Sequence, residues 1–120
     1  MQMEAWELDF EWLRTRHMVK DRFGTSSIPD LQTILFLIGI QEVGEFRAEF
    51  TKEEKQDLIH VAVCTLLEPI GYFSFTGRDH EGWPHWEETK KFTVKGVDAQ
   101  ERLLKEQIIQ FLQGAITEEE

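Results

Sequence analysis

The sequence predicts a mainly α-helical fold, namely a four-helix, bundle-like domain with a short aromatic-rich loop or β-hairpin inserted between the third and fourth helices. Long segments carry apolar residues at helical spacing, and helix start and stop signals separate them. The segment 72–96 instead lacks a 3.6-residue period and holds six of the 14 aromatic residues. The insertion is therefore placed there.

Helices are expected at about 3–20, 29–43, 52–68 and 98–113, with the insertion at 72–96 and an acidic tail at 117–120. A chain of 120 residues has the length of one ordinary domain. Hydrophobic residues make up 41% of it and charged residues 30%, which is enough for a core to form. We therefore expect residues 1–120 to form a single domain.

The first helix carries two apolar stripes on nearly opposite sides, because successive residues turn by about 100°. A helix with two apolar sides needs two neighbours, and both could lie within the chain. The alternative, which we favour, is that one of them belongs to a second subunit of a homodimer. One stripe consists of Met3, Trp6, Phe10, Leu13 and His17, and the other of Ala5, Leu8, Trp12, Thr15 and Val19.

Local signals delimit the other helices. Ser27, Pro29 and Asp30 favour a helix start, and the helix that follows is apolar almost all round. Gly39 lies in its middle and predicts close approach of another helix. Residues 51–54 (Thr-Lys-Glu-Glu) form a capping-box pattern, and residues 98–101 (Asp-Ala-Gln-Glu) resemble one.

Composition excludes several classes of partner. The formal net charge of −10 disfavours contact with phosphates, so we expect no nucleic acid and no membrane among the partners. The longest apolar run has seven residues, 34–40, and is too short to cross a bilayer. Cys64 is the only cysteine and cannot form an intramolecular disulfide, so we expect a cytoplasmic location.

A metal site is one hypothesis for the third helix. Asp57, His60, Cys64 and Glu68 fall on one face, and Asp57 and His60 have the i, i+3 spacing with which carboxylate–histidine pairs hold a metal in helical bundles. The chain has only one clear pair of this kind, but a dimer axis could duplicate it, with Glu42 or Glu45 as added ligands. The alternative is that these are ordinary residues, with Cys64 a small buried hydrophobe. A nucleophilic Cys64 is disfavoured, because it lies mid-helix.

The segment 77–86 gathers charged and aromatic side chains of the kinds that dominate contacts with partners. Alternatively, two tryptophans fold back to plug the open end of the bundle, or the segment and the bundle enclose an aromatic-lined pocket. Together with Trp12 of the first helix, the candidate binding surface comprises Arg78, Asp79, His80, Trp83, His85 and Trp86.

These observations favour a protein–protein interaction or oligomerisation module over an enzyme. The expected partner is a protein, most simply a second copy of the chain. The alternative is a small metal-dependent enzyme that uses Asp57 and His60 with carboxylates from other helices. The sequence identifies no catalytic residue and no cofactor.

Overall fold

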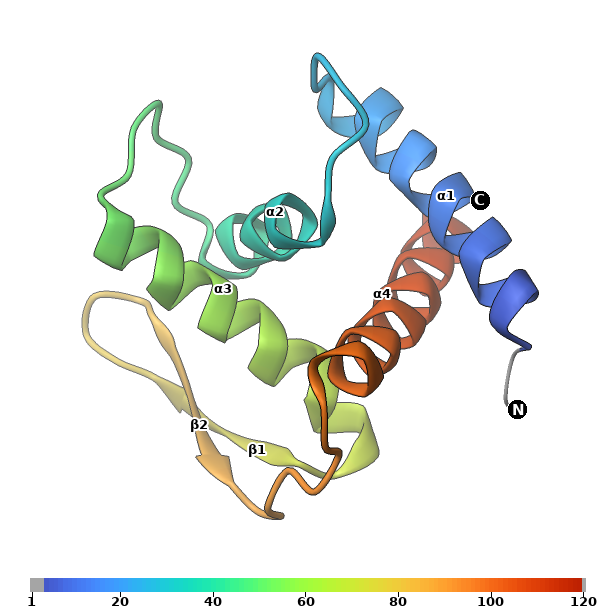
Figure 1. The fold of residues 1–120 in the computed structure, drawn as a ribbon. Helices are drawn as coiled ribbons and strands as arrows, with labels where there is room; N and C mark the ends of the chain where they lie inside the picture. Colours follow the sequence, from blue (N-terminus) through green and yellow to red (C-terminus); the bar gives the residue numbers. More distant parts are fainter. Residues whose placement is uncertain (1–3, 120) are drawn as a thin grey trace. The chain divides into compact units, whose positions relative to one another are not determined.

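A computed structural model describes the backbone of residues 4–119 and the side chains of residues 4–113. Within these residues it contains four α-helices and a two-stranded antiparallel hairpin between the third and fourth, which confirms the predicted fold class (Figure 1). The elements are α1 (Ala5–Phe23), α2 (Leu31–Val43), α3 (Lys52–Leu67), the 3-10 turn η1 (Glu68–Ile70), β1 (Phe73–Arg78), β2 (Pro84–Glu88) and α4 (Val97–Glu119).

The helix bounds differ from the expected ones where a local signal was misread. α1 continues to Phe23 and ends at Gly24, which adopts a left-handed conformation with φ of 69° and whose N–H bonds to the Lys20 carbonyl. α2 begins at Leu31, after Pro29 rather than at it. α4 begins at Val97 and its backbone stays helical through Gly114, because glycine weakens a helix without being barred from it.

Two expectations involve residues that the structure does not describe in full. Met3, expected on the first apolar stripe, lies outside the described residues. The predicted acidic tail at 117–120 falls within the backbone of α4 up to Glu119, but its side chains are outside the described part. None of the described helices is long and apolar enough to cross a membrane.

The chain divides into two compact units, 1–31 with 94–120, and 32–93. In the first unit, α1 packs against α4. One stripe of α1 is buried, and the ammonium of Lys105 on α4 lies 5.6 Å from the centre of the Trp12 ring. Arg16 donates hydrogen bonds to the carbonyls of Pro29 and Ile28, which fixes the segment after α1. A single domain over residues 1–120 stays a prediction.

In the second unit, α2 and α3 approach closely at Gly39, as the sequence predicts. A Cβ atom at this position would lie 2.7 Å from the carbonyl carbon of Leu58. The predicted capping box opens α3, with Thr51 and Glu54 bonding reciprocally. The core of this unit includes Ile34, Leu35, Ile38, Leu58, Val61, Ala62, Cys64, Leu66, Leu67 and Tyr72.

The insertion is a hairpin rather than a loop over 73–88. Phe75 pairs with Trp86 across the strands, and the next pair joins Gly77 to His85, so Thr76 is an extra residue that forms a bulge. Its hydroxyl donates to the His85 carbonyl over 3.1 Å. The backbone N–H of Phe75 donates to the Glu68 carboxylate over 2.7 Å, which ties the hairpin to the end of the third helix.

Candidate functional site

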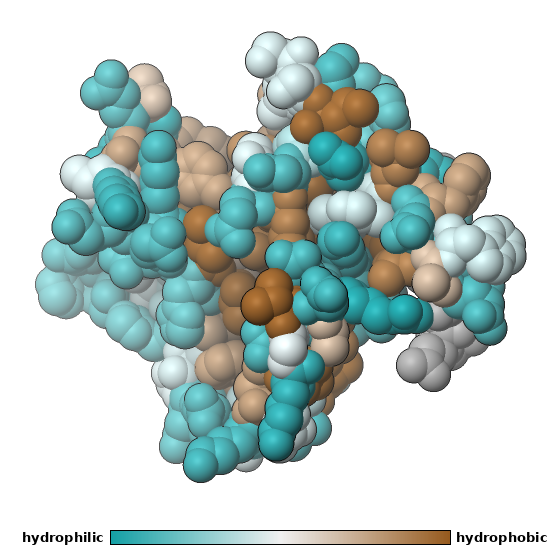
Figure 2. Space-filling model, viewed as in Figure 1, coloured by the Kyte–Doolittle hydropathy of each residue, from teal (hydrophilic) through white to brown (hydrophobic). Residues whose placement is uncertain are grey.

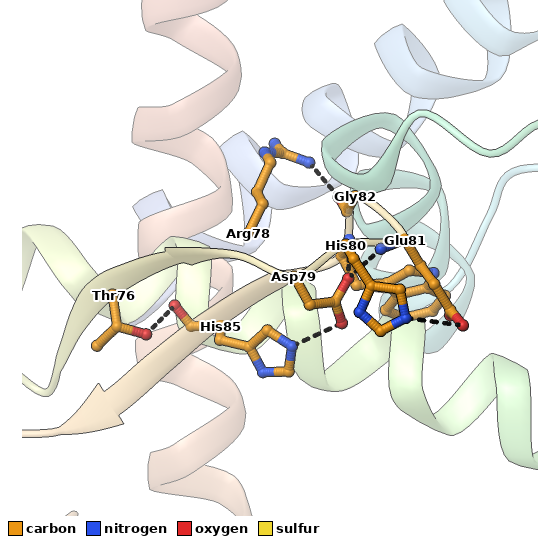
Figure 3. Close-up of polar contacts among 8 residues, drawn as sticks. Thr76, Arg78, Asp79, His80, Glu81, Gly82 and His85 are labelled. Carbon is orange, nitrogen blue, oxygen red and sulfur yellow. Dashed lines mark hydrogen bonds and ion pairs between the residues drawn. The ribbon is translucent and has the colours of Figure 1, made fainter.

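The hairpin turn is organised by the carboxylate of Asp79. Its Oδ1 accepts the backbone N–H groups of Glu81 and Trp83, both at 3.0 Å, and its Oδ2 lies 2.9 Å from Nε2 of His85 (Figure 3). Gly82 has φ of 90°, a left-handed conformation that glycine adopts without strain and that lets the turn close. The five residues between the strands, 79–83, thus form a defined turn, and its Asp79 carboxylate orients the imidazole of His85.

Arg78 fastens this turn to α2. Its guanidinium donates to the carbonyl of Gly82 at 2.8 Å and to that of Glu42 at 3.0 Å. The second acceptor is one of the last carbonyls of α2, which have no partner within the helix. Burial raises the pKa of the Glu42 carboxyl, and the charge of Arg78 partly opposes this. Arg78 is therefore a tether within this unit rather than a free contact residue.

A cavity of about 610 Å³ lies within the second unit, between α3, the hairpin turn and the segment that precedes α3. This volume falls within the range that small ligands occupy. Its lining residues are Glu45, Arg47, Glu54, Asp57, His60, Val61, Asp79, Glu81, Trp83, Pro84 and His85.

The lining of the cavity is strongly acidic, with five carboxylates against one arginine. Arg47 is already paired with Glu54 and lies 3.4 Å from Glu45. The Thr51 backbone N–H and then the Arg47 guanidinium lower the pKa of the Glu54 carboxyl to about 2. The hydrogen bond from His85, followed by that from the Trp83 N–H, lowers the pKa of Asp79. The lining therefore repels anions and favours positively charged groups.

Six of the predicted site residues meet in this cavity, although the sequence assigned them to separate sites. Glu45, Asp57 and His60 come from the metal hypothesis, whereas Asp79, Trp83 and His85 come from the candidate binding surface. Among the described residues, no group of three or more histidine, cysteine or acidic side chains is arranged to hold a metal ion. The spacing of Asp57 and His60 along α3 did bring both side chains to the cavity.

Other predicted site residues lie elsewhere. Glu42 does not line the cavity, and its carbonyl instead receives Arg78. The side chain of His80 is almost fully exposed and lies 3.9 Å from the Glu81 carboxylate. The ring of Trp86 packs edge to face on that of Phe75, with centres 5.7 Å apart. In the described part of the chain, its buried Nε1 has no hydrogen-bond partner. Trp12 is only 8% exposed, which corrects its assignment to a binding surface.

Cys64 has the environment of a structural residue. Its side chain is buried, and burial raises the pKa of the thiol to about 11. Nε2 of His60 lies 3.6 Å from the sulfur. At neutral pH the thiol stays protonated, and a protonated thiol is a poor nucleophile.

Sequence reasoning missed the contribution of the segment before α3. Arg47 lies in this segment and was not singled out, Glu45 was considered only as an added metal ligand, and Glu54 was recognised only as a capping residue. The capping box placed Glu54 at the start of the helix, but no local signal indicated that the hairpin turn would face it. Contacts over more than 25 residues along the chain are not encoded in periodicity.

A second candidate surface lies on α1, on the side opposite its buried stripe. Trp6 is 71% exposed, Phe10 62% and Leu13 47%, and His17 is also exposed. The buried stripe consists of Leu8, Trp12, Thr15 and Val19. Figure 2 shows hydrophobic residues at the surface among hydrophilic ones over this helix, at the upper right. The chain as described thus covers only one of the two predicted stripes.

No protein-family model, curated protein or solved structure matches this chain. The two surfaces must therefore be interpreted from their own chemistry.

Proposed function

We propose that the protein is a self-association module that forms a homodimer through the exposed stripe of α1. The observation that carries this proposal is the exposure of Trp6, Phe10 and Leu13 on one helix face. Burying an exposed tryptophan or phenylalanine side chain against a partner yields a large favourable free energy. Aromatic residues of this kind often dominate the binding energy of interfaces. A clustered set of this kind is typical of an interaction site.

The opposite face of α1 supports this interpretation. Leu8, Trp12 and Val19 are buried, so α1 is already anchored in its own unit and need not turn to bury the other stripe. The exposed stripe is then available to a partner while the helix stays folded. A symmetric dimer presents the same patch from both subunits, and an apolar patch is complementary to itself.

The test is the mass of the untagged protein by native mass spectrometry and by light scattering over a range of concentrations. We expect a dimer for the wild type and a monomer for the double variant Trp6→Glu with Phe10→Glu. Introducing two carboxylates per subunit into an apolar interface leaves buried charges without partners. Circular dichroism of the variant reports whether α1 stays helical.

The matched control is Phe46→Glu. Phe46 is 76% exposed, comparable to Trp6, but it belongs to the second unit and not to α1. This variant should keep the wild-type mass. A wild type that stays monomeric at all concentrations, or a dimer that survives both substitutions in α1, contradicts the proposal.

The partner in this proposal is a protein, and neither nucleic acid nor a membrane is invoked, in keeping with the net charge of −10. The cytoplasm stays the expected compartment because the chain has a single, buried cysteine.

A further inference from the structure

The charges of α1 are segregated along its length. Over residues 4–13, all the charged side chains are acidic, at positions 4, 7, 9 and 11. The second half carries basic residues at positions 14, 16, 20 and 22, with a single acidic one, Asp21. The chain as a whole has a formal charge of −10, so a basic half-helix stands out against it. By helical geometry, Glu7 and Asp9 flank the exposed stripe at its N-terminal end, and Arg14 and Lys20, together with Asp21, flank it at its C-terminal end. Arg14 also lies 3.4 Å from Glu11 of its own helix. The surroundings of the stripe are therefore acidic at one end and carry its basic residues at the other.

The exposed stripe also has a symmetric spacing. Trp6, Phe10, Leu13 and His17 follow one another at intervals of four, three and four residues. Reversing the direction of the helix leaves this spacing unchanged. A second copy that runs antiparallel can therefore set Trp6 opposite His17 and Phe10 opposite Leu13 in a single register.

We infer that the second copy binds α1 in the antiparallel direction, with the acidic half of each helix against the basic half of the other. This inference rests on the proposed function, because it concerns the same exposed stripe. A two-fold axis midway between Phe10 and Leu13 would relate the two helices. A parallel pair would instead bring acidic half against acidic half and basic against basic.

The apolar stripe and the charges have different roles in this arrangement. Burial of the Trp6, Phe10 and Leu13 side chains supplies the affinity. Exposed ion pairs contribute little to affinity, but unlike charges favour one orientation and like charges penalise the other. The charge segregation therefore selects between two arrangements that the apolar stripe alone would allow.

Disulfide trapping distinguishes the two orientations. Trp6 and His17 are eleven residues apart, which is about 16 Å along a helix. A disulfide requires Cα atoms within about 7 Å of each other. In an antiparallel dimer, Trp6→Cys chains mixed with His17→Cys chains should form a mixed disulfide under mild oxidation, whereas each variant alone should form none at these positions. Peptide mass mapping identifies the linked residues, so Cys64 can stay in the chain.

Charge reversal gives an independent readout. Arg14→Glu combined with Lys20→Glu makes the basic half acidic, so it would face the acidic half of the second copy. We expect this variant to dimerise about tenfold more weakly by analytical ultracentrifugation. Lys52→Glu combined with Lys55→Glu changes the net charge equally, on exposed residues of α3, and should leave the affinity unchanged. In a parallel dimer, the α1 variant would replace one like-charge contact by another, with no weakening.

The outcomes separate this inference from the proposed function. A mixed 6–17 disulfide together with weakening by charge reversal supports the antiparallel dimer. A 6–6 disulfide in a protein that dimerises through α1 overturns the antiparallel orientation and leaves the proposed function standing. A protein that is monomeric throughout overturns both.

Discussion

The backbone of Gly39 in α2 lies against the carbonyl group of Leu58 in α3. A Cβ atom at position 39 would lie 2.7 Å from the Leu58 carbonyl carbon and 3.1 Å from its Cα, and still closer to the carbonyl oxygen. The obstacle is backbone rather than the end of a flexible side chain, so the helices would have to move apart to admit it. Leu58 itself is fully buried, which shows that this crossing lies in the core of its unit.

Gly39→Ala should therefore destabilise the protein, although alanine is the better helix former. We expect a loss of about 2 kcal/mol in the free energy of unfolding, as is typical of overpacked cores, after the gain of about 1 kcal/mol in helix propensity. Urea unfolding followed by circular dichroism measures it. Gln41→Ala, an exposed position of the same helix, should change the stability by less than about 0.5 kcal/mol. A Gly39→Ala protein as stable as the wild type would show that α2 and α3 separate freely.

The Gly39 contact shows what local sequence signals can predict. A glycine inside an apolar helix has a cost, and close approach of another helix is the simplest compensation, so its role could be predicted without knowing the neighbour. The capping box of α3 was predicted in the same way, because it needs only residues 51 and 54. The neighbour itself, Leu58, could not be predicted, since periodicity assigns faces and not partners.

The candidate cavity shows where local signals end. The i, i+3 spacing of Asp57 and His60 placed both on one face of α3, and the turn residues around Asp79 were recognised as a cluster. The sequence carried no signal that the two sets would meet. The bulge at Thr76 and the Arg78 tether to α2 orient the turn, and both depend on contacts formed only in the folded chain.

The Asp79 carboxyl should titrate below its ordinary pKa of 3.8, because the His85 hydrogen bond and then the Trp83 N–H stabilise its charged form. His85→Ala should raise this pKa toward 3.8, and a carbon-detected NMR titration of the side-chain carboxyl measures it. His80→Ala removes an imidazole that is five residues closer to Asp79 in sequence than His85, and it should leave the titration unchanged, because the hydrogen bond to Asp79 comes from His85. Equal shifts in both variants would contradict the role given to His85.

Glu54 should make stability depend on acid pH. Its pKa is lowered from 4.5 to about 2 in the folded chain, so the unfolded chain binds the proton more readily between these values. The stabilisation from the charged carboxylate is present above about pH 4.5 and is lost as the pH falls through 2. In Glu54→Gln, unfolding midpoints in urea should change less between pH 5 and pH 2 than in the wild type. Glu53→Gln, the same substitution one residue earlier, serves as the control, and an equal effect there would contradict the assignment.

Cys64 should be unreactive in the folded protein. Burial raises its pKa to about 11, and the thiolate is the reactive form. A chromogenic disulfide reagent at pH 8 should label it slowly in buffer and rapidly in a denaturing concentration of urea. We expect labelling in buffer to be at least about a hundredfold slower than in urea, because pH 8 lies well below the pKa of about 11 that the buried thiol has. Rapid labelling of the folded chain would show that the thiol is accessible and would reopen a chemical role for it.

Substitution of the two tryptophans of α1 by alanine should have very different effects on the stability of the monomer. Trp12 is 8% exposed and Trp6 71%, although they lie on the same helix only six residues apart. Trp12→Ala removes a buried ring and should lower the free energy of unfolding by about 3 kcal/mol, whereas Trp6→Ala should change it by less than about 0.5 kcal/mol in dilute, monomeric protein. At concentrations where the wild type is dimeric, Trp6→Ala should instead reduce the dimer fraction, because its ring belongs to the proposed interface. Equal destabilisation of the monomer by both variants would mean that Trp6 is buried within the chain, and the exposed stripe on which the dimer depends would not exist.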